Sequence, residues 1–219
     1  MPDLPDSGFH RVALFYDRLA RLVYGDAQEQ AQLVLLPFLP RQAKVLVIGG
    51  GSGWILEQLL GTQKQFDILY LDAAPAMLQL AEQRFAKYKF PHNSSVRFRL
   101  GTEQALLPHE QFDVVFTPFL LDLFPPQRLR RLMQRLDAAL APGGHWLFAD
   151  FWPVQQPATW WQRLLVFGMY AFFGTVSGIK ARKLPDYGLH FDELNLREAF
   201  SKSFYSGMIQ GKVFVKQKV

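Results

Sequence analysis

The sequence contains no cysteine, so disulfide bonds and thiolate metal sites are excluded and no redox compartment can be inferred. We also expect no secretory signal, because the first residues carry acids and prolines where a signal peptide needs a basic and then an apolar run. No internal repeat, low-complexity segment or dividing linker interrupts the 219 residues. We therefore expect a single domain over residues 1–219 and a cytoplasmic location.

Long apolar runs and dense charge are scarce. The uncharged run over residues 164–179 falls short of the ~20 residues that a membrane span needs, and it contains three glycines. Lys180, Arg182 and Lys183 follow it, and Trp-rich apolar helices with basic flanks lie on membranes, so a weak membrane-surface contact stays open. The net charge of +5 is spread thinly, with mild clusters at 128–135 and 180–183, so nucleic acid is not expected as a partner.

The most informative stretch runs from Lys44 to Leu60. Its apolar run, 45–48, predicts a strand that is buried on both faces, as in a parallel sheet. Glycines then occupy positions 49, 50, 51 and 53, and an apolar, helix-compatible run begins at Trp54. A strand, a glycine turn and a helix in this order build an anion-binding corner, because glycine permits positive φ and the helix N-terminus presents free N–H groups.

A carboxylate accompanies this corner. The second apolar run, 66–71, ends in Asp72, where a bound ribose would meet a hydrogen-bond acceptor. The dinucleotide fingerprint G-x-G-x-x-G is absent, since its last glycine would fall on Trp54 or Leu56. A nicotinamide-dependent oxidoreductase is therefore an alternative that the glycine spacing opposes.

The glycine pattern that is present, G-x-G-x-G, resembles motif I of the class I S-adenosylmethionine-dependent methyltransferases, and residues 70–77 resemble their motif II. The resemblance implies S-adenosylmethionine as cofactor, with its methionine part facing the glycine turn and both ribose hydroxyls held by Asp72. Many members carry an acid two residues before the first glycine, where this chain has Val47.

The same resemblance suggests further contacts. The corner after the third predicted strand, 96–100, often has an acid near the adenine amino group; Thr102 or Glu103 is the counterpart here, although Thr102 also suits a helix N-cap. Residues 117–119 follow the fourth predicted strand, 112–116, at an edge where ligands bind in open α/β sheets. Tyr16 resembles a tyrosine that caps the cofactor pocket in quinone- and lipid-type methyltransferases. The predicted cofactor-binding residues are Gly49, Gly50, Gly51, Gly53, Asp72, Ala73, Met77, Thr102, Glu103, Thr117, Phe119 and Tyr16.

The predicted fold class is α/β, a three-layer sandwich with a seven-stranded, mostly parallel Rossmann-like sheet and an antiparallel last strand. Local patterns support an open α/β sheet, and the strand count comes from the resemblance. Residues 1–42 are expected to form an N-terminal helical cap and the aromatic-rich stretch 152–190 a lid insertion. Predicted helices cover 9–24, 27–36, 75–88, 128–140 and 191–200, with strands at 145–151, 203–208 and 212–216, the last two joined through Gln210-Gly211.

The implied function is methyl transfer to a small, largely apolar or aromatic acceptor. No metal is needed, because the sulfonium already makes the methyl group electrophilic, and most of the catalysis is positioning. His190, Asp150 and Tyr187 are candidates for a general base from position only, and a lone histidine among aromatics is also a common structural residue. Two further alternatives are a non-catalytic S-adenosylmethionine-binding scaffold and an aminopropyltransferase. The second places a carboxylate after the fourth strand, where this chain has Thr117.

Overall fold

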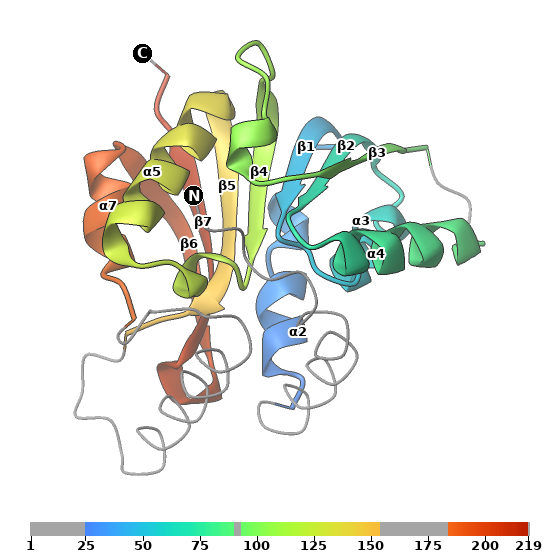
Figure 1. Ribbon diagram of the computed structural model, residues 1–219. Helices are drawn as coiled ribbons and strands as arrows, with labels where there is room; N and C mark the ends of the chain where they lie inside the picture. The colour runs from blue at the N-terminus through green and yellow to red at the C-terminus, as the bar shows by residue number, and fades with distance from the viewer. Residues whose placement is uncertain (1–24, 90–92, 154–183, 219) are drawn as a thin grey trace.

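A seven-stranded sheet forms the centre of the computed structural model, which describes residues 25–89, 93–153 and 184–218 (Figure 1). The strands follow the order β3-β2-β1-β4-β5-β7-β6. β7 is antiparallel to both neighbours, whereas every other pair is parallel, so the predicted mostly parallel sheet is confirmed. The strands are β1 Gln42–Ile48, β2 Gln65–Asp72, β3 Ser95–Leu100, β4 Phe112–Pro118, β5 Leu140–Phe151, β6 Leu196–Phe204 and β7 Ile209–Lys216.

Two apolar clusters, one on each face of the sheet, make the three layers. Val45 and Val47 of β1 belong to the first cluster, and Leu46 and Ile48 belong to the second. This alternation explains why β1 reads as an unbroken apolar run, since both of its faces are covered. β3 forms an edge of the sheet, as its alternating Arg residues predicted.

Helices cover both faces (Figure 1). The first cluster includes residues of α2 Ala27–Leu33, α3 Trp54–Gly61 and α4 Pro75–Lys87. The second includes residues of α5 Pro126–Ala139 and α7 Tyr187–Glu193. Among the residues described, no helix has the length and apolar character needed to cross a membrane.

The end of the chain differs from the prediction. The expected helix over 191–200 is wrong: α7 ends at Glu193, and β6 begins at Leu196. Asn195 takes a left-handed φ of 55°, which stops the helix. The expected turn at Gln210-Gly211 is also wrong, because both residues lie inside β7 and the hairpin turns at Tyr205–Gly207.

The carboxyl ends of the parallel strands define one edge of the sheet. β1 leads there into the glycine turn, which we define as residues 49–53, β2 ends in Asp72, and β4 leads to Phe119. Ligands bind outside this edge in open α/β sheets, especially where the strand order reverses, as it does between β1 and β4. The predicted helix over 9–24, with Tyr16, lies outside the described residues, as does most of the predicted lid.

Candidate functional site

The glycine turn adopts a conformation that needs its glycines. Gly49, Gly51 and Gly53 have φ values of 69°, 62° and 88°. A Cβ on Gly49 would lie 2.6 Å from a Leu120 side-chain carbon, and one on Gly53 would lie 2.8 Å from the Ala81 Cα. A Cβ on Gly51 would meet no described atom within 4 Å. Packing against other residues therefore explains Gly49 and Gly53, whereas no described residue occupies the place that a side chain at Gly51 would take.

Asp72 holds this turn from the end of β2. Its Oδ2 accepts a hydrogen bond from the Gly51 N–H at 3.1 Å, and its Oδ1 accepts one from the Ala74 N–H at 2.9 Å. The residue is 7% exposed, and this burial raises the pKa of Asp72 to about 6, against the lowering effect of the backbone hydrogen bonds. The N–H groups of Gly51, Ala73 and Ala74 all act on this carboxylate, which has about four acceptor positions, so it keeps acceptor capacity for a ribose hydroxyl. The open glycine and the buried acid beside it thus fit a nucleoside whose ribose lies against β2.

Two other predicted residues flank Asp72. Ala73 is exposed directly after it, and Met77 is half-buried in the first turn of α4. On the neighbouring strand, Leu100 is the register partner of Asp72 and is 53% exposed. Leu100 is not among the predicted cofactor-binding residues, although an apolar residue at the carboxyl end of an edge strand is a signal that the sequence carries.

The corner after β3 gives Thr102 and Glu103 contacts within the protein. The Thr102 hydroxyl accepts from the Gln104 N–H at 3.4 Å, which is the N-cap role considered above. Glu103 is 4% exposed, and its Oε2 accepts from Arg128 Nη2 at 2.6 Å. An adenine contact through Glu103 would have to use its other oxygen, and this contact stays a prediction.

The corner after β4 combines a buried hydroxyl with a strained residue. The Thr117 side chain is buried and accepts a hydrogen bond from the Trp146 indole N–H at 3.0 Å, so its hydroxyl links β4 to β5. Phe119 has a φ of 51°, which is unusual for an aromatic residue and marks strain of a kind found at functional sites. Its N–H donates to the Ala149 carbonyl at 2.7 Å, and its ring meets Phe151 edge-on at 5.6 Å.

Asp122 and Asp150 form a buried carboxyl pair behind this corner. Asp150 is fully buried and accepts hydrogen bonds from the Leu121 and Phe151 N–H groups at 2.9 and 2.8 Å. Burial raises the pKa of Asp122 to about 6, and burial together with the charge of Asp122 raises the pKa of Asp150 well above its usual range. Both carboxyl groups are therefore harder to ionise than a free aspartate, and the Asp150 hydrogen bond from Leu121 ties the corner to β5. The Asp150 side chain has no exposed surface in this structure, and its role as a base stays a prediction.

The other two candidates for a general base lie on α7, which packs on the α5 face of the sheet. The Tyr187 ring is buried against Phe148 at 5.1 Å. His190 Nδ1 lies 3.7 Å from Glu193 Oε2, and the histidine side chain is 18% exposed. The structure thus groups Tyr187 and His190 with each other on this helix, apart from the glycine turn, and their role as a base stays a prediction.

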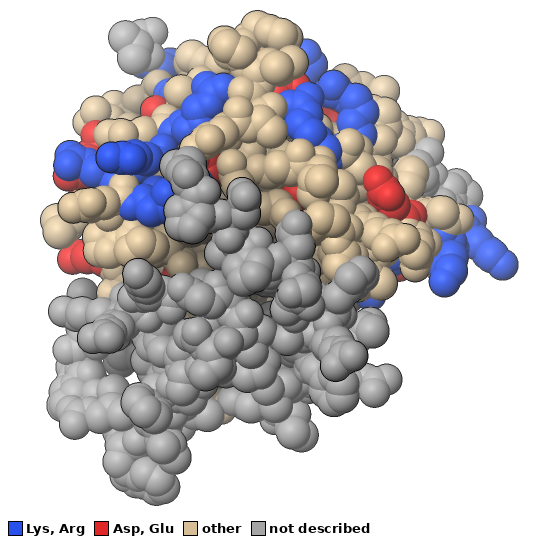
Figure 2. All heavy atoms as spheres, in the orientation of Figure 1, with Lys and Arg blue, Asp and Glu red and all other residues tan. Residues whose placement is uncertain are grey.

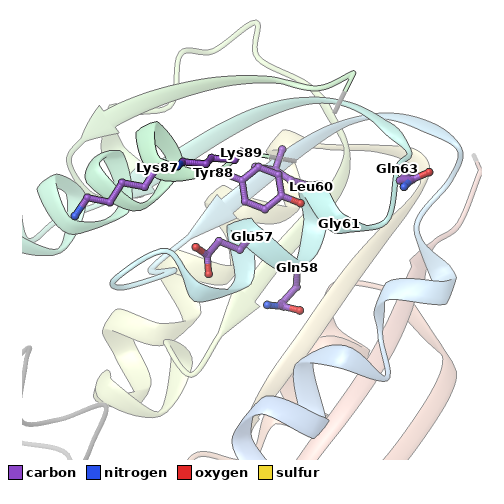
Figure 3. Close-up of a pocket in the computed structure, with 8 residues that line it drawn as sticks. All are labelled: Glu57, Gln58, Leu60, Gly61, Gln63, Lys87, Tyr88 and Lys89. Carbon is purple, nitrogen blue, oxygen red and sulfur yellow. The ribbon is translucent and has the colours of Figure 1, made fainter. Parts of the chain in front are cut away.

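A surface groove of about 670 Å³ lies elsewhere, between the ends of α3 and α4 (Figure 3). It is wide open and sits on the outer helical layer rather than at the carboxyl edge of the sheet. Glu57, at its rim, already pairs with Arg84 at 2.9 Å. We assign it no ligand, because its position separates it from the glycine turn. Its lining residues are Glu57, Gln58, Leu60, Gly61, Gln63, Lys87, Tyr88 and Lys89.

Basic side chains on the described surface form separate groups divided by uncharged surface (Figure 2). Several of them pair with acids: Arg99 with Glu110 at 2.7 Å, for example, and Arg97 with Asp67 at 3.3 Å. Paired, scattered cations are typical of a solvated face.

Known proteins share this arrangement. A family model described as "Methyltransferase domain" matches residues 46–146, from β1 into β5. A malonyl-[acyl-carrier protein] O-methyltransferase of Paenibacillus sp. (strain JDR-2) is 30% identical over 115 residues, which cover 51% of this chain and 40% of that protein. The match thus spans less than half the length of this curated relative.

Solved structures agree on the fold. A chain of the complex between the Haloferax volcanii Trm112 methyltransferase activator and a methyltransferase has a TM-score of 0.70 and 16% identity, covering 99% of this chain and 100% of that chain. The N-methyltransferase NodS from Bradyrhizobium japonicum WM9, solved with S-adenosyl-L-homocysteine, has a TM-score of 0.61 and 17% identity, covering 88% of each chain. Residues 46–146 thus match a methyltransferase domain, and the chain has the fold of solved methyltransferases. A role of the glycine turn and Asp72 in holding a cofactor stays a prediction.

Proposed function

We propose that this methyltransferase transfers a methyl group from S-adenosylmethionine to a small, largely apolar or aromatic acceptor. The observation that carries the proposal is the pairing of Gly51 with Asp72: open backbone on one side, a buried carboxylate on the other, and a 3.1 Å hydrogen bond joining them. This pairing supports a ligand that combines a ribose with a group needing close backbone approach.

Other residues have roles that follow from their places around this pair. Asp72 accepts the ribose hydroxyls through the lone pairs that its backbone bonds leave. Leu100, exposed beside Asp72 on β3, offers an apolar surface to the adenine ring. Met77, half-buried in the first turn of α4, adds a second apolar contact at this edge.

The cofactor supplies an electrophilic methyl group on a sulfonium. The protein aligns the acceptor with that group and keeps water away, and most of the rate enhancement comes from this alignment. The acceptor atom gains the methyl and loses its proton to a base or to water. Tyr187, His190 and Asp150 stay candidates for that base, and the Asp150 side chain is fully buried.

The acceptor class rests on the aromatic character of the chain around the strained corner. The ring of Phe119 meets Phe151, and the segment that follows β5 is rich in Trp, Tyr and Phe. An apolar pocket with few polar groups suits a flat or greasy acceptor. The prediction that residues 152–190 form a lid concerns residues mostly outside those described, and it stays a prediction together with the weak membrane-surface contact.

Binding and turnover test the proposal separately. Calorimetry should show S-adenosylhomocysteine binding in the micromolar range (about −8 kcal/mol) and no binding of NAD. Labelled S-adenosylmethionine should then yield a methylated product with an acceptor from a panel of phenols, quinols and apolar carboxylic acids. Tight NAD binding without S-adenosylhomocysteine binding would refute the cofactor assignment. Cofactor binding with no turnover on any acceptor would favour the non-catalytic scaffold.

A further inference from the structure

Tyr70 lies under the glycine turn. It belongs to β2, two residues before Asp72, and its side chain is fully buried. Its hydroxyl donates a hydrogen bond to the Gly51 carbonyl at 3.0 Å. Since residues two apart on a strand face the same side of the sheet, Tyr70 and Asp72 reach the same turn together.

The Gly51 residue is therefore held from both of its peptide groups. Its N–H donates to Asp72 at 3.1 Å and its carbonyl accepts from Tyr70. With φ at 62°, Gly51 has no side chain to pack and would otherwise be free to rotate. Rotating either peptide group of Gly51 out of place breaks the hydrogen bond that this group makes.

No neighbour on β1 shares this task. Val47 is the register partner of Tyr70 on β1, and it is fully buried in the apolar cluster that also contains Tyr70. A valine has no polar atom to offer the turn, so among the described residues β2 supplies both side chains that bond to Gly51. Arg84 of α4 holds the next residue, since its Nε donates to the Ser52 carbonyl at 3.1 Å.

Tyr70 also explains the second glycine. A Cβ on Gly50 would lie closer than 3.0 Å to the hydroxyl oxygen and two ring carbons of Tyr70. Such a contact requires something to shift, because real Cβ atoms essentially never come so close. The absence of a side chain at Gly50 and the bulk of Tyr70 are thus complementary.

We infer that Tyr70 is a positioning residue for the cofactor: it does not touch the ligand but sets the direction in which the Gly51 peptide faces it. The inference rests on the proposed function, because it takes the open side of Gly51 as the cofactor-binding surface. A ligand that binds to a fixed backbone does not pay for ordering that backbone, so affinity should fall when the turn is released.

The test compares Tyr70→Phe with Ile68→Val in the full chain. Tyr70→Phe keeps the ring and removes the donor, and we expect S-adenosylhomocysteine to bind threefold to tenfold more weakly by calorimetry, the worth of about one hydrogen bond. Ile68 lies two residues earlier on the same strand and in the same apolar cluster, so Ile68→Val loosens the core without touching the turn. It should leave the affinity within twofold of the parent, even if the two variants lose similar thermal stability.

A second measurement needs no ligand. Amide hydrogen exchange at Gly51 in the free protein should be about tenfold faster in Tyr70→Phe and unchanged in Ile68→Val. Gly50→Ala should act like Tyr70→Phe on both measurements, because the new methyl group displaces the hydroxyl.

The outcomes separate the two ideas. Unchanged affinity and unchanged Gly51 exchange in Tyr70→Phe would overturn the inference, and so would equal losses in Tyr70→Phe and Ile68→Val. Faster Gly51 exchange in Tyr70→Phe, together with a parent protein that binds no S-adenosylhomocysteine, would support the two hydrogen bonds that hold Gly51 and refute the proposed function alone.

Discussion

Replacing Gly51 by alanine tests the candidate site most directly. Gly51 has a φ of 62°, and a Cβ there would enter space in which no described atom lies within 4 Å. The substitution therefore has two consequences that can be measured apart: backbone strain in the free protein, and an obstacle on the surface where we place the cofactor.

The strain follows from the left-handed conformation. An L-residue costs about 1–2 kcal/mol there, so the free energy of unfolding should fall by roughly that amount in urea denaturation. The obstacle acts only on the complex, because the methyl group stands where the ligand must approach the backbone. We expect S-adenosylhomocysteine affinity to fall at least tenfold, or about 1.4 kcal/mol.

Gly207→Ala provides the matched control. Gly207 has a φ of 85°, and its Cβ would likewise meet nothing within 4 Å of the described atoms. It lies in the turn between β6 and β7, and strands β4 and β5 separate that hairpin from β1. It should show a similar loss of stability and unchanged affinity. If Gly51→Ala loses stability as the control does but still binds S-adenosylhomocysteine like the parent, the glycine turn is not the binding surface.

Three further predictions concern the acids and the segment after β5. Asp72→Ala should weaken S-adenosylhomocysteine binding roughly 10- to 100-fold, since each hydrogen bond to a charged acceptor contributes ~1.5–3 kcal/mol; unchanged calorimetric affinity would contradict this role. The pKa of Asp72 is raised from 3.8 to about 6 in the folded protein, so the folded state binds the extra proton and stability is lost as pH rises through that window. The free energy of unfolding should therefore fall by up to about 3 kcal/mol between pH 4 and pH 8 from this group, and Asp72→Asn should flatten that slope; parallel profiles for parent and variant would show that the carboxyl does not titrate as described. Replacing residues 158–183 by a short Gly-Ser linker should spare S-adenosylhomocysteine binding and abolish turnover of an apolar acceptor, and turnover at the parental rate would show that this segment is no lid.

The part of the fold around the candidate cofactor site could be predicted because its sequence patterns are local. β1, the glycine turn, α3 and β2 follow one another along the chain, and each carries its own pattern: buried apolar runs for the strands and glycines for the turn. Asp72 ends the second of these strands, so its place at the carboxyl edge follows from the order of the elements alone.

The end of the chain lacked such signals. β6 is an edge strand with mostly exposed residues, including Arg197, Glu198 and Lys202, so its burial could not impose a period of two on the sequence. Its few apolar residues fell at a spacing that also fits a helix, and the left-handed Asn195 that separates α7 from β6 is not marked by glycine or proline.

Contacts between segments distant in sequence could not be predicted. Asp122 and Asp150 meet only because β4 and β5 pair, and Tyr70 reaches Gly51 only because β2 lies beside β1. The sequence contains these residues but not their separations. The proximity of the two carboxyl groups and the hydrogen bond to Gly51 became visible only in the structure.

The end of β5 and the start of α7 meet at one point of the molecule. The rings of Trp152 and Tyr187 lie 5.5 Å apart. The backbone N–H of Trp152 donates to the Met208 carbonyl, and Lys212 Nζ lies 4.4 Å from the centroid of the Trp152 ring. The chain between Trp152 and Tyr187 thus starts and ends at two residues that contact each other, and β7 holds Trp152 in place. Since closing a loop costs only about 0.6 kcal/mol more for each doubling of its length, Trp152 and Tyr187 are suitable points at which to replace the chain between them. Segments of other lengths could be exchanged there while β1, β2 and the glycine turn are left unchanged.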